Sequence, residues 1–249
     1  MRRDNNMGKY SSVSGKLGII GAMPEEVSAL KQSMSDVKVS EIACMDFFEG
    51  KIGGRDAVVV QCNMGKVNAA VCAQLLISKF DVECIINTGV AGSLDARINI
   101  GDIVVSTEAV QHDYDLTPIG GQPGEILDYG ITAFKADEKL VRYAVDAVKK
   151  TSPAVRAFEG RICSGDQFIA SRQQKEKIVS TFGGLCCEME GAAIAQVCYI
   201  NKTPFVIIRA ISDKADDSEE MSFAEFKKDA AARCAAITKY IAENSGSTE

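Results

Sequence analysis

Two adjacent carboxylates follow the first apolar run of the chain. In the segment Gly21–Glu26, Pro24 suits the first turn of a helix, and Glu25 and Glu26 come directly after it. The helix dipole stabilises negative charge at this end, so a carboxylate that faced a crevice would stay ionised and could act as a general base. The alternative is that both acids only compensate the dipole, which is worth about 0.3–1 kcal/mol. The spacing leaves both interpretations open.

Two later segments carry charges beside apolar runs. Glu188 and Glu190 flank Met189 between an apolar run and an alanine-rich run, and the segment Arg209–Asp213 ends the most strongly β stretch of the chain. Acids in apolar surroundings are costly unless they are paired. Because ligands of open α/β sheets bind beyond the carboxyl ends of the strands, these segments favour a functional site. For the two glutamates, capping of the following helix is the alternative.

A glycine-rich segment, Asn87–Ser93, could bring bare backbone amides close to an anion or a sugar. It matches neither G-x-G-x-x-G nor the phosphate-binding G-x-x-x-x-G-K-[ST] loop, which occurs nowhere in the chain. A tight turn from a strand into a helix explains the glycines equally well. The segment therefore predicts no particular cofactor.

The strands that would position these segments are short apolar runs bounded by glycine, proline or polar residues. Gly53-Gly54 punctuates two of them and predicts a hairpin. We expect strands at Lys16–Ala22, Ile42–Phe48, Ala57–Cys62, Cys84–Thr88, Asp102–Ser106 and Pro204–Ile211, and a further strand that ends at Arg161–Cys163.

Helical patterns alternate with these strands. Two of them open with capping boxes, Ser171 with Gln174 and Ser222 with Glu225. The second box is predicted to start a terminal helix that runs to about residue 243. The other helices are expected at Pro24–Lys31, Val67–Lys79, Ala136–Lys150 and Gly191–Asn201.

This alternation predicts an α/β fold with a mostly parallel sheet covered on both faces, and the hairpin makes the sheet mixed. We expect one domain over residues 16–243, preceded by a disordered leader at 1–15 and followed by a polar tail at 244–249. The glycine-rich stretch Leu116–Gly130 is predicted to be a long loop. Loops longer than about 12–15 residues are usually functional, and this one favours a homodimer.

Composition narrows the function classes. The 249 residues are 46% hydrophobic and carry a formal net charge of −6, with a pI near 5.1, which argues against nucleic-acid binding. No apolar run approaches the roughly 18 residues of a membrane span. Nine cysteines without a C-x-x-C pattern, beside the single His112, predict reduced thiols in a cytoplasmic protein rather than disulfides or a zinc site.

Eight segments in chain order carry a family signature: IIGAMPEEV, GKVNAA, INTGVAGS, GDIVVS, HDYDLTP, SGDQFI, CEMEGAAIAQVC and PFVIIRAISD. Together they resemble the 5′-methylthioadenosine/S-adenosylhomocysteine nucleosidases of the purine nucleoside phosphorylase-like superfamily. The resemblance covers Lys16–Tyr240. It implies a three-layer αβα sandwich with a central mixed, partly barrel-like β-sheet, a homodimer, and irreversible hydrolysis of the adenine–ribose bond of a nucleoside substrate without metal or cofactor.

The resemblance also implies roles on the ribose side of such a substrate. Glu26 would activate the attacking water, and Arg209 would lie near the same water. Glu190 would hold the ribose hydroxyls, and Met189 would pack against the sugar.

On the base side, Phe168 would stack on adenine and the backbone of Ile169 would read its edge. Asp213, supported by Ser212, would protonate adenine at N7. Breaking an N-glycosidic bond builds positive charge on the ribose and negative charge on the purine, so one carboxyl must be neutral and the other ionised.

Two features depart from the family pattern. Val90 stands where family members often carry serine, which removes a polar group at the crevice. The loop Thr117–Tyr129 matches the pattern poorly, and in the family this region meets the 5′-substituent in the neighbouring subunit's pocket. The preferred 5′-substituent therefore stays open, and hydrolysis of a related nucleoside such as aminofutalosine is an alternative.

Two further alternatives share the fold. A phosphorylase would use phosphate in place of water, but phosphate recognition favours arginine, and this chain presents Glu25 and Glu26 at the first loop. A non-catalytic nucleoside sensor would not require an acid and a base together, whereas this chain carries Glu26, Glu190 and Asp213.

Overall fold

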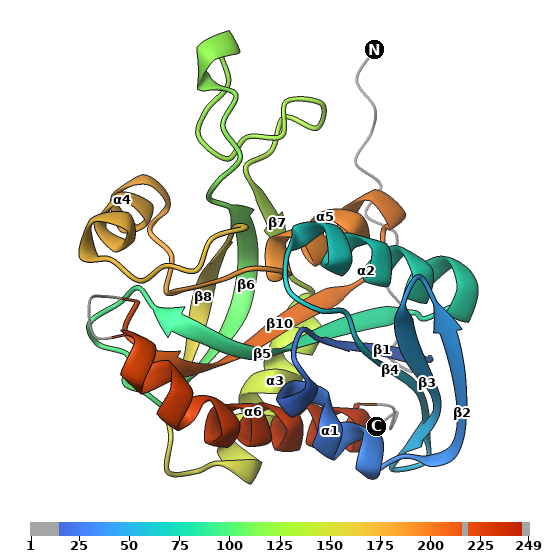
Figure 1. The fold of residues 1–249 in the computed structure, drawn as a ribbon. Helices are drawn as coiled ribbons and strands as arrows, with labels where there is room; N and C mark the ends of the chain where they lie inside the picture. Colours follow the sequence, from blue (N-terminus) through green and yellow to red (C-terminus); the bar gives the residue numbers. More distant parts are fainter. Residues whose placement is uncertain (1–14, 216–218, 246–249) are drawn as a thin grey trace.

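Runs of valine and isoleucine form the inner strands of a single sheet (Figure 1). The computed structural model describes residues 15–215 and 219–245. Its strands are β1 (Leu17–Gly21), β2 (Ser35–Ile42), β3 (Met45–Ile52), β4 (Arg55–Gln61), β5 (Cys84–Ser93), β6 (Ile103–Gln111), β7 (Ala133–Lys135), β8 (Ala157–Ser164), β9 (Cys186–Glu188) and β10 (Phe205–Asp213). Every residue of β1, β5 and β10 is buried, as expected for strands covered on both faces.

Part of the sheet closes on itself. The strands follow the order β10-β6-β8-β9-β5-β1-β4-β3-β2, with β7 beside β6, and β10 also pairs with β5. Strands β5, β9, β8, β6 and β10 therefore form a five-stranded barrel. The sheet contains parallel pairs, such as β1–β5 and β5–β10, and antiparallel pairs, such as β3–β4 and β6–β10. The expected mixed, partly barrel-like sheet is confirmed.

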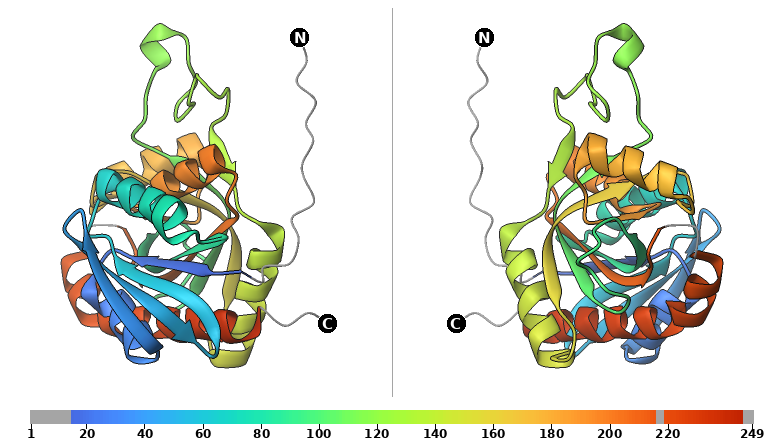
Figure 2. Two further views of the ribbon diagram at one scale, coloured as in Figure 1. Left: turned by 90° about the vertical axis from the view of Figure 1, so that its right-hand side faces the viewer. Right: turned by 90° about the vertical axis from the view of Figure 1, so that its left-hand side faces the viewer.

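Helices cover both faces of the sheet (Figures 1 and 2). The helices are α1 (Pro24–Gln32), α2 (Lys66–Phe80), α3 (Glu138–Thr151), α4 (Arg172–Phe182), α5 (Gly191–Asn201) and α6 (Glu219–Asn244). Helices α2 and α5 lie on one face, and α1, α3 and α6 lie on the other. The three-layer αβα sandwich is confirmed.

Successive residues of a strand pack into different layers of the core, because side chains along a strand alternate between the two faces of the sheet. Ile20 and Ile85 pack with the α2–α5 layer, whereas Ile19 and Ile86 pack with the α1–α3–α6 layer. A third, smaller cluster packs Ile178 of α4 with Val110 and Cys163 of the barrel strands. No helix in the described part of the chain is long and apolar enough to cross a membrane.

Three local expectations were wrong. The run Ile42–Phe48 is not one strand: β2 ends at Ile42, and Ala43 and Cys44 turn the chain with positive φ angles before β3 begins. The strand β2 was missed because it is an edge strand whose residues are largely exposed and polar. The terminal helix begins at Glu219, three residues before the start that was predicted at Ser222.

The third error concerns the glycine-rich segment after Thr88. It is no turn into a helix, because β5 continues through Gly89 and Gly92 to Ser93 with every residue buried. The glycines instead leave room for the side chains of Glu26 and Asp213, which lie close to the backbone of β5.

The predicted long loop Leu116–Gly130 lies between β6 and β7 and projects from the body of the molecule (Figure 2). Its regular structure is the 3-10 turn η1 (Thr117–Ile119). The predicted leader and tail fall, apart from residues 15, 244 and 245, outside the described residues.

Candidate active site

A pocket open to solvent lies where β1, β5, β9 and β10 reach their carboxyl ends. This is the edge at which the sequence predicted a site. Eight of the nine predicted site residues line it: Glu26, Val90, Phe168, Ile169, Met189, Glu190, Ser212 and Asp213. The ninth, Arg209, is fully buried beside the pocket and does not line it.

Glu26 is fixed by backbone donors. Its Oε2 accepts from the N–H groups of Ala22 at 2.6 Å and Met23 at 2.9 Å, and its Oε1 accepts from the N–H of Val90 at 3.0 Å. We expected the helix terminus to keep this carboxylate ionised. Burial instead raises the pKa of Glu26 above its ordinary value, against the opposing charge of Arg209 and the three N–H donors. Burial thus makes this carboxylate a stronger base than an exposed one.

The strand β5 makes room for this carboxylate. A Cβ at Gly89 would lie 2.3 Å from Glu26 Oε1, so only glycine fits there. Val90 lies within the strand rather than after its end. It lines the pocket, its amide donates to Glu26, and its side chain belongs to the core cluster beside α1, α3 and α6. Gly89 thus leaves space for the carboxylate of Glu26, and the backbone amide of Val90 holds it.

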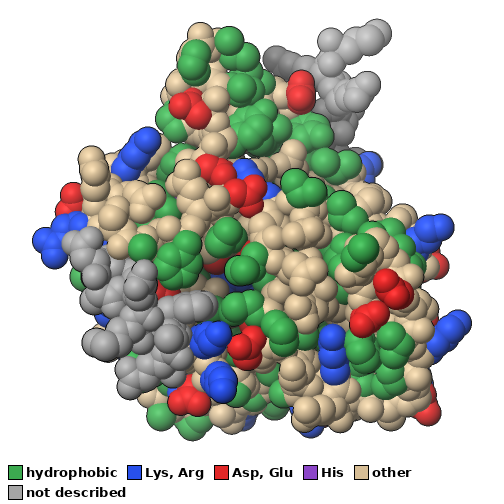
Figure 3. All heavy atoms as spheres, viewed as in Figure 1, with side chains coloured by type: hydrophobic (Ala, Val, Ile, Leu, Met, Phe, Trp, Pro, Cys, Tyr) green, Lys and Arg blue, Asp and Glu red, His purple; other side chains and the backbone are tan. Residues whose placement is uncertain are grey.

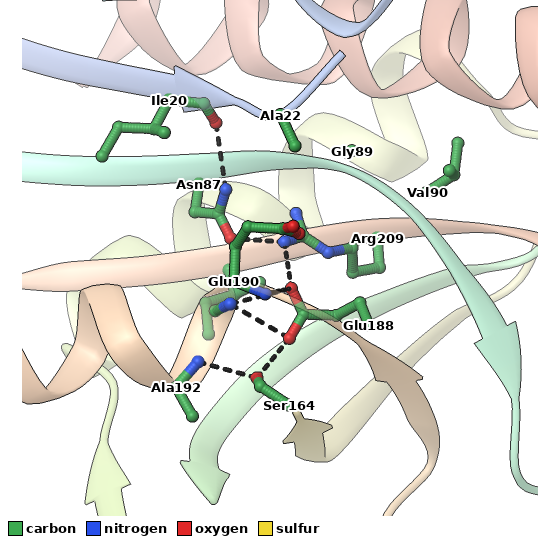
Figure 4. A network of polar contacts seen from close by, with 12 residues as sticks. Ile20, Ala22, Asn87, Gly89, Val90, Ser164, Glu188, Glu190, Ala192 and Arg209 are labelled. Atoms are coloured by element: carbon green, nitrogen blue, oxygen red, sulfur yellow. Dashed lines mark hydrogen bonds and ion pairs between the residues drawn. The ribbon is translucent and has the colours of Figure 1, made fainter. Parts of the chain in front are cut away.

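Arg209 is the centre of a buried network (Figure 4). Its guanidinium donates to Glu188 Oε2 and to Asn87 Oδ1, and Asn87 in turn donates to the carbonyl of Ile20 at 3.0 Å. Burial by itself would lower the pKa of Arg209, but the neighbouring carboxylates, Glu188 first, raise it further above its ordinary value. Arg209 is thus held as a cation beneath the acids of the pocket.

Glu188 links this cation to the start of α5. Its carboxylate accepts from the N–H groups of Glu190 at 3.2 Å and Gly191 at 2.8 Å and from the hydroxyl of Ser164 (Figure 4). Capping of the following helix was the alternative for both glutamates in this segment, and it applies to Glu188. The importance of Glu188 was missed because its partners, Arg209 and Ser164, are distant in sequence.

Glu190 faces the pocket instead. Its Oε1 accepts from the N–H of Gly65 at 2.8 Å, at the beginning of α2. Burial, and next the charge of Glu188, raise the pKa of Glu190 from its ordinary value of 4.5 to about 8. Glu190 therefore holds a proton at neutral pH.

Asp213, at the end of β10, also lines the pocket. Its Oδ2 accepts from the hydroxyl of Ser212 at 2.7 Å, and its Oδ1 accepts from the N–H of Ala215 at 3.0 Å. A Cβ at Gly92 would lie 2.5 Å from Oδ1, so this glycine of β5 admits Asp213 just as Gly89 admits Glu26. Two glycines of one strand therefore make room for two acids of the same pocket.

Less polar residues complete the walls. Ile169 is buried and Met189 is half-buried, whereas Phe168 keeps 50% of its surface exposed at the edge of the pocket. Met64 and Cys187 also line the pocket and were not predicted, because nothing in their local sequence distinguishes them from core residues. Among the described residues, no cluster of three or more histidine, cysteine or acidic side chains is placed to hold a metal ion.

A barrel-containing αβα sandwich with acids at the strand ends has counterparts among known proteins. The phosphorylase superfamily matches residues 16–243, so the chain is a member of that class. The 5′-methylthioadenosine/S-adenosylhomocysteine nucleosidase of Psychromonas ingrahamii is 41% identical over 230 residues, which cover 92% of this chain and 99% of the relative. Within the superfamily, this chain belongs to the 5′-methylthioadenosine/S-adenosylhomocysteine nucleosidases, which are N-ribosyl hydrolases.

Solved structures agree with this assignment. The nucleosidase of Colwellia psychrerythraea, in complex with adenine, has a TM-score of 0.90 and 39% identity over 94% of this chain and 98% of its own. The futalosine hydrolase of Helicobacter pylori has a TM-score of 0.86 and 33% identity over 91% of this chain and 97% of its own. This fold is thus shared by nucleosidases and by a futalosine hydrolase.

Proposed function

We propose that this protein hydrolyses the N-glycosidic bond of 5′-methylthioadenosine and S-adenosylhomocysteine and releases adenine. The observation that carries the proposal is the presence of two buried acids, Glu26 beside Gly89 and Asp213 beside Gly92, in one pocket. They differ in their partners: backbone amides and a nearby guanidinium surround Glu26, whereas a hydroxyl and one amide hold Asp213. Such a difference suits one base and one acid.

The proposed reaction involves two proton transfers, one to Glu26 and one from Asp213. Water attacks C1′ of the ribose, and Glu26 accepts the proton that this water loses. The bond between C1′ and N9 breaks with its electron pair moving to the purine, and Asp213 gives its proton to N7. The products are adenine and the 5-substituted ribose. Acid or base assistance of this kind typically contributes about 10²–10⁴-fold each.

The remaining residues would bind the two halves of the nucleoside. Glu190 would hold the ribose hydroxyls and Met189 would pack on the sugar. Phe168 would stack on adenine, and the backbone of Ile169 would meet its edge. Arg209, which does not reach the cavity, would act through its charge on Glu26 rather than by touching substrate.

Water rather than phosphate is the proposed nucleophile. Glu25 and Glu26 stand at the loop after β1, where a phosphate dianion would meet like charge. We expect adenine release from 5′-methylthioadenosine in phosphate-free buffer, with no ribose 1-phosphate formed when phosphate is added. An absolute requirement for phosphate would make the enzyme a phosphorylase.

The 5′-substituent is best tested directly. Free adenine can be measured by chromatography across a panel that contains adenosine, 5′-methylthioadenosine, S-adenosylhomocysteine and aminofutalosine. The proposal expects the two sulfur-containing nucleosides to give the highest kcat/KM. A clear preference for aminofutalosine would instead place the substrate with that of the futalosine hydrolase relative, while absence of any adenine would favour a sensor.

We also propose a homodimer. Apolar side chains near the pocket are exposed: Met64 is 62% and Val67 74% exposed at the start of α2, and Ile119 on the projecting loop is 72% exposed. Figure 3 shows hydrophobic side chains gathered on that loop. A second copy of the chain would cover them, since exposed apolar patches usually mark interaction sites. Sedimentation at assay concentration should give a dimer, and a fully active monomer would contradict this proposal.

A cytoplasmic location is proposed from the cysteines. All nine are free, and eight of them are buried. Burial raises the pKa of most of these thiols, for example that of Cys84 to about 11, so they behave as small apolar side chains. Fractionation of the native host would test the location.

A further inference from the structure

Three of the family segments contain charged residues that have no assigned role above: the lysine of GKVNAA, the acids of HDYDLTP and the aspartate of SGDQFI. One residue of each meets the others in the structure. Lys66 Nζ donates to Asp113 Oδ1 at 2.7 Å, the N–H of Lys66 donates to Asp166 Oδ1 at 2.8 Å, and the N–H of Asp166 donates to Asp113 Oδ2 at 2.8 Å. We call these three residues the lysine–aspartate cluster.

The cluster joins three separate parts of the fold. Lys66 begins α2, Asp113 follows β6, and Asp166 follows β8. The ion pair is partly shielded from water, with the side chains of Lys66 and Asp113 only 19% and 16% exposed. Burial opposes ionisation of Asp113, but its hydrogen bonds with Lys66 and with the amide of Asp166 lower its pKa overall. A shielded, hydrogen-bonded pair fixes geometry better than an exposed one.

One end of the cluster reaches the proposed ribose side of the pocket. Gly65 directly precedes Lys66, and its N–H donates to Glu190. Gly65 has a φ of +98°, a conformation that favours glycine, and a Cβ there would lie 3.1 Å from Asp166 Oδ1. No side chain caps α2 at its N-cap residue, so Glu190 and Asp166 accept the N–H groups of Gly65 and Lys66 in its place.

The other end of the cluster reaches the proposed base side. Asp166 stands two residues before Phe168 and three before Ile169, which line the pocket. The same carboxylate that receives the amide of Lys66 therefore also anchors the loop that carries these residues. None of the three cluster residues lines the cavity, so a role would be indirect.

We propose that the lysine–aspartate cluster is a positioning device that holds the amide of Gly65 on Glu190 and so sets how strongly the site recognises the ribose hydroxyls. This inference rests on the proposed contact of Glu190 with those hydroxyls. Loss of the ion pair frees the start of α2 to move away from Glu190. The carboxyl then loses its fixed position, and the contribution of a ribose hydroxyl to transition-state binding falls.

The test compares two substrates that differ in one hydroxyl, 5′-methylthioadenosine and its 2′-deoxy analogue. The ratio of their kcat/KM values reports recognition of the 2′-hydroxyl and is independent of the fraction of folded enzyme. For Lys66→Met we expect this ratio to fall about three- to tenfold from the wild-type value, with Lys66→Arg retaining most of it. Asp166→Asn, a milder change at an exposed position, should move the ratio in the same direction.

Lys16→Met is the matched control, because Lys16 makes a similar partly buried ion pair with Glu49 at 2.7 Å, remote from the pocket. It should leave the ratio unchanged. If Lys66→Met and Asp166→Asn lower both kcat/KM values by one common factor, the cluster is only structural and the proposal is overturned. Glu190→Gln identifies the other failure: a wild-type ratio in that variant would remove the proposed hydroxyl contact, and the positioning role with it.

Discussion

The two sides of the pocket bury their acids by different means. On the ribose side, three carboxylates, Glu26, Glu188 and Glu190, surround the guanidinium of Arg209. On the base side, Asp213 accepts hydrogen bonds from the hydroxyl of Ser212 and from the backbone amide of Ala215. Burial and the neighbouring charge of Glu188 raise the pKa of Glu190 to about 8, so this part of the site retains a proton at neutral pH.

This contrast explains the division of labour that we propose. A crowded, proton-retaining cluster can take up a proton from water, because its charge can be redistributed among several acids. An isolated acid beside a hydroxyl is suited to deliver one proton to one atom. The walls differ as well, since the ribose side is a hydrogen-bonded network whereas the base side has the half-exposed ring of Phe168.

The largest expected effects come from removing either acid. Glu26→Gln and Asp213→Asn should each lower kcat by about 10²–10⁴-fold while substrate still binds, because each change removes a proton transfer and keeps the shape of the side chain. Single-turnover kinetics and equilibrium binding separate the two effects. Glu25→Gln is the adjacent control, because Glu25 pairs with Lys227 and does not line the pocket. Wild-type turnover in both pocket variants would contradict both assigned roles.

The second prediction uses the proton on the ribose side. The folded protein holds a proton on Glu190 up to about pH 8, whereas an unfolded chain releases it near 4.5, so stability falls as the pH rises through this window. Between pH 6 and 8 the loss should be about 2 kcal/mol in the substrate-free enzyme. Urea unfolding should show a smaller loss for Glu190→Gln. Parallel pH curves for the two proteins would mean that Glu190 is not the group that retains the proton.

A smaller effect is expected from Phe168→Ala on the base side. Stacking of a base on an aromatic ring contributes about 1–3 kcal/mol, and the half-exposed ring should lie at the lower end, with KM raised about 5- to 30-fold and kcat little changed. Adenine affinity should weaken by the same factor. Unchanged adenine affinity would show that the ring does not stack on the base.

The smallest effect is expected at Val90, between the two sides. Its amide, not its side chain, holds Glu26, so Val90→Ser should keep that contact and change kcat/KM by less than about tenfold, or ~1.4 kcal/mol. Of the two hydroxyls that could compensate for the valine, Ser212 lines the pocket, whereas Ser93 donates to the carbonyl of Asp95. A hundredfold gain in cleavage of adenine nucleosides would mean that Val90 adapts the site to another substrate.

Most of the fold could be predicted from local patterns. The boundaries of α5 were predicted as observed, since an alanine-rich run with a glycine at its start defines a helix without reference to its neighbours. The edge strand β2 could not be predicted in this way, because its polar, exposed residues carry no signal of burial. The course of β5 through Gly89 and Gly92 depends on Glu26 and Asp213, which approach from other strands and helices.

The site shows the same limit. Charged residues at strand ends pointed to Glu26 and Asp213, because such positions are unfavourable without a partner. The family resemblance, not the spacing, assigned roles to Phe168 and Met189. The function of Glu188 as the link between Arg209 and α5 follows only from the folded structure, since it brings together residues that are distant in sequence.

The division of labour between the two sides can be tested most directly by changing the leaving group. A 5-methylthioribosyl 4-nitrophenyl ether carries a leaving group that departs without protonation, so it needs the base but not the acid. We predict that Asp213→Asn cleaves it within about tenfold of the wild-type rate, whereas Glu26→Gln remains impaired by about 10²-fold or more. Equal impairment of both variants with this substrate and with 5′-methylthioadenosine would contradict the assignment of the acid to one side and the base to the other.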